Sequence, residues 1–282
     1  MTVEPVWIPR LASDEDALEP LSAARLAKPP PKRDWMIEGC FSKGTVGLIA
    51  GAGGIGKSLV CQQLASCAVI GHSWLELAVA PGRALYLGCE DDQDELHRRQ
   101  WNINRELGFE MDDLIDAGLH LIPRVARDNR LMYLDKPRNA DWRMQRTTLM
   151  DRLVEYCCEA GIQYVFLDTA TKTFGGNQND ERQVSDYISE MQRLAIAIQG
   201  VVILLKQPSA TGRANGTGES GSVQWENSVR SRLYLAEDKA KGITTLRGMK
   251  QNYGRKLEPI VLEYRRGVFV RQEPEVFRRW QD

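Results

Sequence analysis

The chain has 282 residues, of which 43% are hydrophobic and 27% charged, so it can bury a sizeable core and we expect one large domain. Its 37 Lys and Arg nearly balance 38 Asp and Glu, which excludes a protein whose whole surface attracts nucleic acid. No apolar run reaches the ~18 residues of a membrane span, and the N-terminus has no signal-peptide core. We therefore expect a cytoplasmic protein with no membrane partner.

The six cysteines show neither a CxxC pair nor a Cys/His spacing typical of a metal site. Three of them fall inside apolar runs, where a free cysteine behaves as a small hydrophobic residue. This usage predicts reduced core thiols, as in a cytoplasmic protein.

The first 34 residues carry little periodic apolar pattern and end in AKPPPKRD, whose three prolines favour an extended stretch. We interpret residues 1–34 as an extended arm and residues 35–282 as the folded domain.

From Trp35 onward, short apolar runs alternate with helical segments, a pattern typical of a mostly parallel sheet with helices on both faces. The predicted strands are residues 44–50, 83–90, 119–123, 162–168 and 201–205. The predicted helices start at Lys57, run from the acidic residues after 90 to about Leu107, and span 146–160 and 181–199, with a polar insertion at 124–145. The sequence therefore predicts an α/β fold.

After Trp225 the helices stop, and four strand-like runs follow with only turns between them. They are SRLYLAE, ITTLRGMK, PIVLEYR and GVFVR. We expect antiparallel strands that extend the C-terminal edge of the sheet. The segment 209–222, rich in Gly, Ser and Thr, is predicted to be a mobile loop.

The stretch from Gly51 to Ser58, GAGGIGKS, satisfies the phosphate-loop pattern GxxxxGK[ST] between a buried strand and a helix. Glycines let backbone N–H groups turn toward phosphates, and the helix N-terminus adds positive charge. Lys57 would reach the β- and γ-phosphates and Ser58 would ligate Mg²⁺. The pattern predicts binding of ATP or GTP, with these contact residues: Gly51, Gly53, Gly54, Ile55, Gly56, Lys57, Ser58 and Leu59.

A phosphate loop needs a second carboxylate for its magnesium ion at the end of a neighbouring apolar strand, and QYVFLD ends in Asp168. ATPases that place a glutamate directly after this aspartate would read DE, but Thr169 stands there. Glu90 ends the strand LYLGCE and is our candidate to polarise the attacking water. Asp91 and Asp92 are rivals, although acidic residues are common in the first turn of a helix.

This layout resembles the RecA-like ATPases and, within them, the RepA-type hexameric replicative helicases of plasmids and phages. The resemblance covers residues 44–254 and rests on GTVGLIAGAGGIGKS, LYLGCEDD, YVFLDTATKTF, VVILLKQPS, SVRSRLYL and GMKQNYG, in this order. It implies a RecA-like core, ATP with Mg²⁺ as cofactors, and a homo-oligomer, expected to be a hexamer. The partners that it implies are single-stranded DNA and a replication initiator or primase.

The resemblance also assigns roles to individual residues. Arg230 would be an arginine finger that reaches the ATP of the adjacent subunit, with Arg232 as an alternative and Lys250 as a weaker second charge. The related helicases usually carry two histidines where this chain has Lys206 and Gln207. Gln207 resembles instead the glutamine with which RecA and DnaB-like proteins sense the γ-phosphate.

Two loops would line the channel of such a ring, one after Asp168 and one after Gln207. We expect their basic residues to contact DNA phosphates: Lys172, Lys206 and Arg213. The predicted function is an ATP-hydrolysing DNA helicase or translocase in plasmid or phage replication.

Three alternatives stay open. A RecA-like regulatory or recombination-mediator ATPase would share the catalytic residues without unwinding DNA. A P-loop small-molecule kinase would need an acceptor pocket and an arginine-bearing lid after the phosphate loop, which the C-terminal strands do not resemble. A protein that binds nucleotide only as a structural switch is the third.

Overall fold

The computed structural model describes residues 20–135, 142–208, 224–238 and 242–272. It divides the chain into two compact units, Met1–Asp34 and Trp35–Asp282. The described part of the first unit contains one short helix, α1 (Ala23–Leu26). The loop expected at 209–222, including Arg213, lies outside the described residues.

The second unit is built on a sheet with strand order β14-β13-β12-β11-β3-β10-β8-β4-β5. The strands β11, β3, β10, β8, β4 and β5 run parallel to their neighbours. Strands β12, β13 and β14 complete the sheet in antiparallel pairs. In chain order the strands are β3 (Thr45–Gly51), β4 (Arg83–Gly88), β5 (Leu119–Pro123), β8 (Ile162–Asp168), β10 (Val201–Lys206), β11 (Ser231–Asp238), β12 (Ile243–Gln251), β13 (Ile260–Arg265) and β14 (Val268–Arg271).

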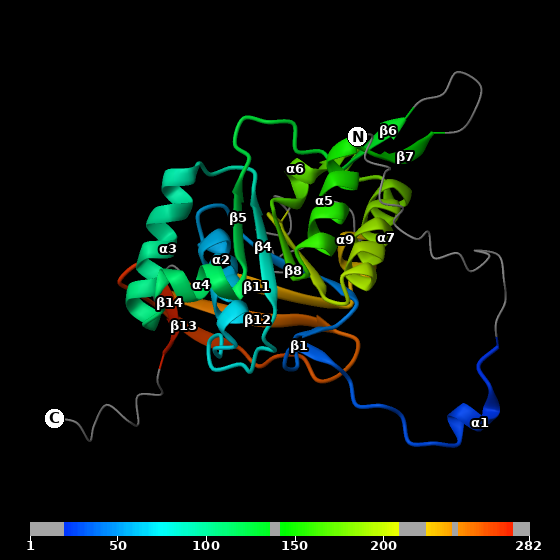
Figure 1. Cartoon of the computed structure of the whole chain (residues 1–282), viewed down its shortest axis with the longest axis horizontal. Coiled ribbons are helices and arrows are strands. Elements are labelled where there is room, and N and C mark those ends of the chain that lie inside the picture. Colours follow the sequence, from blue (N-terminus) through cyan, green and yellow to red (C-terminus); the bar gives the residue numbers. More distant parts are fainter. Residues whose placement is uncertain (1–19, 136–141, 209–223, 239–241, 273–282) are drawn as a thin grey trace. The chain divides into compact units, whose positions relative to one another are not determined.

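The central parallel strands are buried along nearly their whole length because helices cover both faces of the sheet. Figure 1 shows α2, α3 and α4 on one face and α5, α7 and α9 on the other. The bounds are α2 (Lys57–Ile70), α3 (Gln93–Leu107), α4 (Met111–Ala117), α5 (Thr148–Glu159), α6 (Ala170–Thr173), α7 (Glu181–Ala197) and α9 (Gln224–Asn227).

Helix α2 is buried on almost every side because it lies between the sheet and the helices α3 and α4. Its polar side chains are paired across this interface. Gln62 donates to the carbonyl oxygen of Leu96, and Ser66 accepts a hydrogen bond from Gln100. The helix that follows the phosphate loop is therefore fixed to the helix that follows Glu90.

Two parts of the fold differ from the sequence-based expectation. The first of the four C-terminal strands, β11, pairs parallel with β3, and only its other edge is antiparallel, to β12. The polar insertion at 124–145 contains a hairpin, β6 (Met132–Asp135) and β7 (Arg143–Arg146), joined by β9 (Phe174–Gly175) in a separate sheet. A further pair, β1 (Trp35–Ile37) and β2 (Phe41–Ser42), opens the second unit.

Candidate nucleotide-binding site

The loop between β3 and α2 has a backbone that only glycine adopts without strain at two positions. Gly54 has φ +75° and Gly56 has φ +97°, both in the left-handed region. A Cβ atom on Gly56 would also lie 2.5 Å from a ring carbon of Phe269 in β14. The C-terminal strands therefore pack directly against the base of this loop.

Lys57 begins α2 and is buried, with its ammonium donating to the carbonyl oxygen of Ala52 in the same loop at 2.8 Å. Burial lowers the pKa of this lysine, while the negative charges of Asp168 and Glu90 act in the opposite direction. A cation held at this point by two carboxylates and a loop of N–H groups is suited to a polyphosphate.

Asp168 ends β8 and is 2% exposed. The Tyr86 hydroxyl, from the neighbouring strand β4, donates to its Oδ2 atom at 2.5 Å. Among the described residues, its Oδ1 atom has no hydrogen-bond partner. Burial raises the pKa of Asp168, and the hydroxyl groups of Ser58 and Tyr86 oppose this shift.

An unpartnered buried carboxylate oxygen is uncommon, and it is an oxygen donor of the kind that Mg²⁺ prefers. Ser58 supplies a second oxygen next to it. The donor set at this point therefore fits Mg²⁺ bound together with a nucleotide.

Glu90 and its two rivals are in different environments. Asp92 is the N-cap of α3 and accepts a hydrogen bond from the Glu95 N–H. Asp91 pairs with Arg99 at 2.6 Å. Within the described part of the chain, no hydrogen bond or ion pair engages the exposed Glu90 side chain.

Gln207 follows the last residue of β10 and is exposed at the same edge of the sheet. Its amide nitrogen lies 3.7 Å from the position that a Cβ atom on Gly53 would take. The structure therefore brings Lys57, Asp168 and Gln207 together around the glycine loop, because the carboxyl ends of adjacent parallel strands meet at one edge of a sheet.

The arginine candidates are separated by burial. Arg232 is 5% exposed and pairs with Glu226 at 2.9 Å, so its guanidinium is committed inside the subunit. Arg230 is exposed at the start of β11. Lys250 donates to the carbonyl oxygens of Glu226 and Asn227, both at 2.9 Å.

The predicted DNA contacts also differ from one another. Lys172 is exposed on α6. Arg213 lies outside the described residues. Lys206 is 2% exposed and points into the protein, so the prediction that it contacts DNA does not fit its position. The strand pattern put Lys206 at a strand end, but it did not show that α9 covers it.

Sequence reasoning missed two residues that shape the site. Tyr86 reads as an ordinary core residue in the apolar run RALYLGCE, although a buried tyrosine hydroxyl usually finds a partner. Phe269 lies far along the chain from the loop that it supports, and no local pattern links the two.

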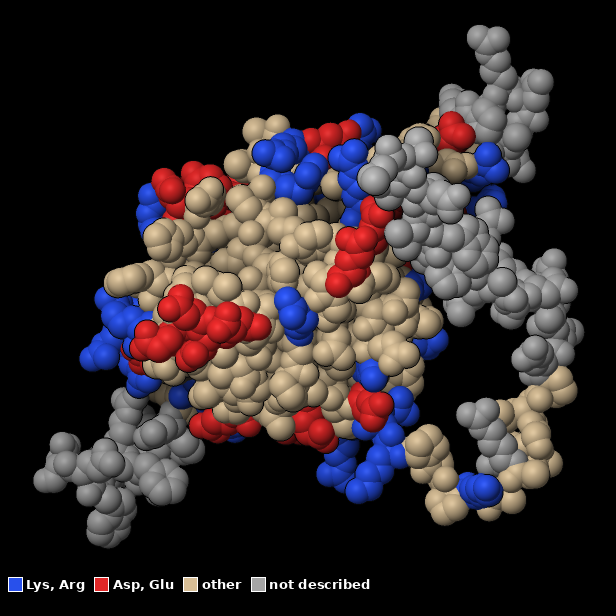
Figure 2. Space-filling view, viewed as in Figure 1, with Lys and Arg blue, Asp and Glu red and all other residues tan. Residues whose placement is uncertain are grey.

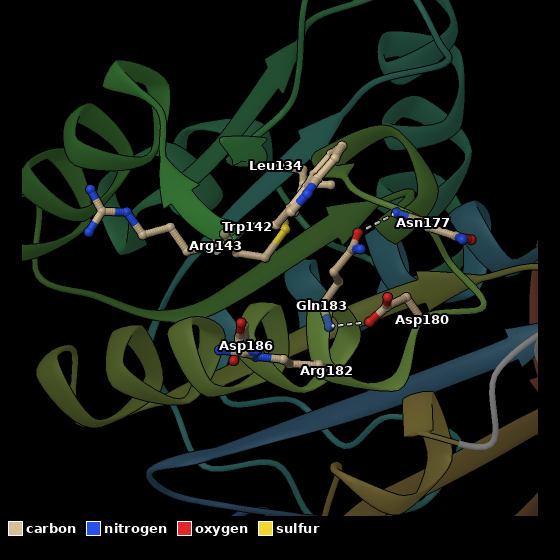
Figure 3. A pocket seen from close by; sticks show the side chains of 9 residues that line it. Leu134, Trp142, Arg143, Asn177, Asp180, Arg182, Gln183 and Asp186 are labelled. Atoms are coloured by element: carbon tan, nitrogen blue, oxygen red, sulfur yellow. Dashed lines mark hydrogen bonds between the residues drawn. The ribbon is translucent and has the colours of Figure 1, made fainter. Parts of the chain in front are cut away.

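A pocket of about 580 Å³ lies away from the glycine loop, between the β6–β7 hairpin and the start of α7. Figure 3 shows Leu134 and Trp142 of the hairpin region on one side and Asp180, Gln183 and Asp186 on the other. On the face drawn in Figure 2, Lys and Arg are mixed with Asp and Glu around the rim. This face carries no extended area of one charge sign among the described residues.

A family model described as an AAA domain matches residues 12–213. The chain is similar to a solved structure of the ATPase domain of a helicase, with 15% identity and a TM-score of 0.55, over 82% of this chain and 86% of that chain. It is also similar to the KaiC-like protein PH0186 from the hyperthermophilic archaeon Pyrococcus horikoshii OT3, with 13% identity and a TM-score of 0.56, over 86% and 100%.

At these identities the likeness concerns the fold, and it confirms the predicted α/β class with a large, mostly parallel sheet as in RecA-like ATPase domains. Among the described residues, no helix is both long and apolar enough to cross a membrane.

Proposed function

Because the chain belongs to the AAA domain family, a family of ATPase domains, we propose that it hydrolyses Mg²⁺·ATP and uses this reaction to move along single-stranded DNA. In the finer form of the proposal, it is a ring-forming, hexameric helicase of the RepA type that serves plasmid or phage replication. Residues 35–282 would be the ATPase domain, and residues 1–34 an arm.

The observation that carries the proposal is the convergence of side chains from three strand ends on one glycine loop. Lys57 lies inside the loop, Asp168 has a buried oxygen with no hydrogen-bond partner in the described chain, and Gln207 lies beside Gly53. Such an arrangement suits a triphosphate with its metal ion, and a sensor at the γ-phosphate.

The chain's residues would then divide the work of hydrolysis. The loop N–H groups and Lys57 would bind the β- and γ-phosphates, and Ser58 and Asp168 would hold Mg²⁺, which supplies charge neutralisation at the phosphates. Glu90 would accept the proton of the attacking water. Its carboxylate suits this role because no hydrogen bond or ion pair in the described chain engages it.

An exposed arginine at the start of β11 supports a site shared between subunits. We propose that Arg230 reaches the γ-phosphate bound by a neighbouring copy, which requires an oligomer. Arg232 is the weaker candidate because Glu226 already binds it. Lys172, exposed on the segment after Asp168, would contact DNA phosphates.

The test compares nucleotide binding with hydrolysis in purified protein. We expect Lys57→Ala to lose ATP affinity, and Glu90→Gln to bind ATP but hydrolyse it at least ~100-fold more slowly, since only proton transfer is removed. Asp92→Asn is the matched control, because asparagine caps a helix as well as aspartate does. Turnover in Glu90→Gln equal to that of Asp92→Asn would contradict the role of Glu90.

Oligomerisation and DNA dependence are tested separately. We expect the mass in solution to rise to that of a ring with ATP and Mg²⁺, and single-stranded DNA to stimulate hydrolysis. Arg230→Ala mixed with Glu90→Gln should recover activity, because mixed junctions can combine an intact Arg230 with an intact Glu90. Hydrolysis without strand displacement on a forked duplex would favour a regulatory ATPase.

A further inference from the structure

Lys206 and Gln207 are consecutive residues at the carboxyl end of β10, and their side chains lie in different places. Gln207 is exposed beside Gly53 of the phosphate loop. Lys206 is buried on the face of the sheet that α7 and α9 cover. Because successive side chains of a strand point to opposite faces, a shift of this strand end moves both at once.

The ammonium of Lys206 joins two segments that are distant in sequence. It donates to Gln178 Oε1 at 2.7 Å, and it lies 4.4 Å from the ring centre of Trp225 in α9. The Trp225 indole N–H in turn donates to the carbonyl oxygen of Gln178 at 3.2 Å. Lys206, Gln178 and Trp225 therefore form one contact unit, which we call the Lys206 junction.

The segment around Gln178 is itself fixed to α7. Gln183 accepts a hydrogen bond from the Asn177 N–H at 2.7 Å, and its own N–H donates to Asp180 at 3.0 Å, both drawn in Figure 3. This segment follows β9 and α6, the helix that carries Lys172. The junction therefore reaches the loop that we propose contacts DNA.

Aromatic rings extend the junction on its other side. Trp225, Phe174 and Tyr187 pack edge to face, with ring centres 5.3 to 5.8 Å apart. The Tyr187 hydroxyl is hydrogen-bonded to Thr173, the last residue of α6. Such rigid, directional contacts transmit a displacement rather than absorb it.

Helix α9 leads directly to the exposed Arg230. The residue after Trp225, Glu226, pairs with Arg232 at 2.9 Å, and Lys250 donates to carbonyl oxygens of the same helix. The position of α9 therefore fixes the start of β11, where Arg230 lies.

A lysine is an expensive choice for this place if packing alone matters. Burial lowers the pKa of Lys206 to about 8, which means that the folded chain disfavours the charged form. A methionine has a similar length and would fill the same space without this penalty. The ammonium contributes something that packing does not: a directional bond to Gln178 and an attraction to the Trp225 ring.

We propose that Lys206 is a positioning residue that links the γ-phosphate sensor Gln207 to the segment carrying Lys172 and to the helix that precedes Arg230. The inference rests on the proposed ATPase function. When Gln207 responds to the γ-phosphate, the end of β10 shifts, and the Lys206 junction carries the shift to α6 and α9. Lys206 itself touches neither nucleotide nor DNA.

The experiment measures ATP hydrolysis by the full chain, with and without an oligothymidylate, in the parent, Lys206→Met and Lys206→Arg. We expect the methionine variant to keep its KM for ATP within about twofold while kcat with DNA falls about tenfold. The arginine variant keeps a charge that can bind Gln178 and should retain most of kcat. The melting temperature of Lys206→Met should equal or exceed that of the parent, which separates positioning from mere support of the fold.

Gln178→Leu provides a second reading if the arginine does not fit, because Gln178 is only half-buried and its loss should not unfold the chain. It should show the same fall in kcat at constant KM. Parent-like kcat and DNA stimulation in both Lys206→Met and Gln178→Leu would overturn the inference alone. A parent chain with no ATPase activity would overturn the proposed function, and this inference with it.

Discussion

Replacing Tyr86 with phenylalanine removes one hydroxyl group from the floor of the candidate nucleotide site and leaves the ring in place. Tyr86 is fully buried on β4, and its hydroxyl donates to Asp168 Oδ2. The other oxygen of that carboxylate already has no hydrogen-bond partner among the described residues. The substitution therefore weakens the anchoring of the carboxylate that we propose holds Mg²⁺.

The expected magnitude follows from this geometry. A hydrogen bond to a charged group contributes about 1.5–3 kcal/mol, so without nucleotide the free energy of unfolding should fall by about 2 kcal/mol. Residues that orient a metal ligand typically change metal affinity ~10- to 100-fold. We expect the Mg²⁺ concentration for half-maximal hydrolysis to rise by a factor in this range.

The assay titrates Mg²⁺ at fixed ATP and measures hydrolysis, with urea unfolding in parallel. Tyr164→Phe is the matched control: Tyr164 is also buried in the sheet, on β8, but its hydroxyl donates to the carbonyl oxygens of Met36 and Ala80. The control should lose stability and keep the parent's Mg²⁺ requirement. An unchanged Mg²⁺ requirement in Tyr86→Phe would refute the assignment of Asp168 as a metal ligand positioned by Tyr86.

Two further predictions concern stability. Gly56→Ala should lower the free energy of unfolding by more than the ~1–2 kcal/mol that a left-handed backbone costs, because the Phe269 ring must also move, whereas Gly54→Ala, with no described atom within 4 Å of its Cβ position, should lose only the backbone term. Urea unfolding of both variants checks this, and equal losses would show that Phe269 can move freely. Lys206 has a folded pKa of about 8 against an ordinary value of 10.5, so the unfolded chain binds more protons between these pH values and the parent's stability should rise across this window by up to about 3 kcal/mol. Lys206→Met should lack this rise, and parallel pH profiles of the two proteins would contradict it.

The parallel core could be predicted because its strands are buried on both faces. Residues 162–168 and 119–123 coincide with β8 and β5, and 201–205 falls one residue short of β10. Such strands are continuous apolar runs bounded by polar residues, which a sequence displays directly.

The hairpin β6–β7 could not be found in this way. Its strands are largely polar, with Arg143 and Arg146 exposed, so residues 124–145 read as an insertion without structure. Its pairing with β9 depends on a contact between segments far apart in the chain. Strand β11 shows the same limit, because its direction relative to β3 is decided by a sheet neighbour and not by its own residues.

The candidate site was predicted in outline, and its internal contacts were not. Strand ends locate Asp168 and Gln207 beside the loop, since parallel strands place their carboxyl ends together. No pattern in the sequence reveals that Trp225 covers Lys206 or that Glu226 binds Arg232. These pairings arise only when α9 packs against the end of β10.

The packing of Phe269 against Gly56 has a consequence for the order in which the protein is made. A ribosome releases the glycine loop early, but β3 lies between β10 and β11, and β14 comes later still. The nascent chain therefore holds an apolar strand without its two sheet neighbours for most of its synthesis. Pairings of such high sequence separation form slowly. We expect ATP to stabilise only chains that have been synthesised past Phe269, so nucleotide cannot act as an early folding template, and the unpaired strand is a binding site for chaperones during translation.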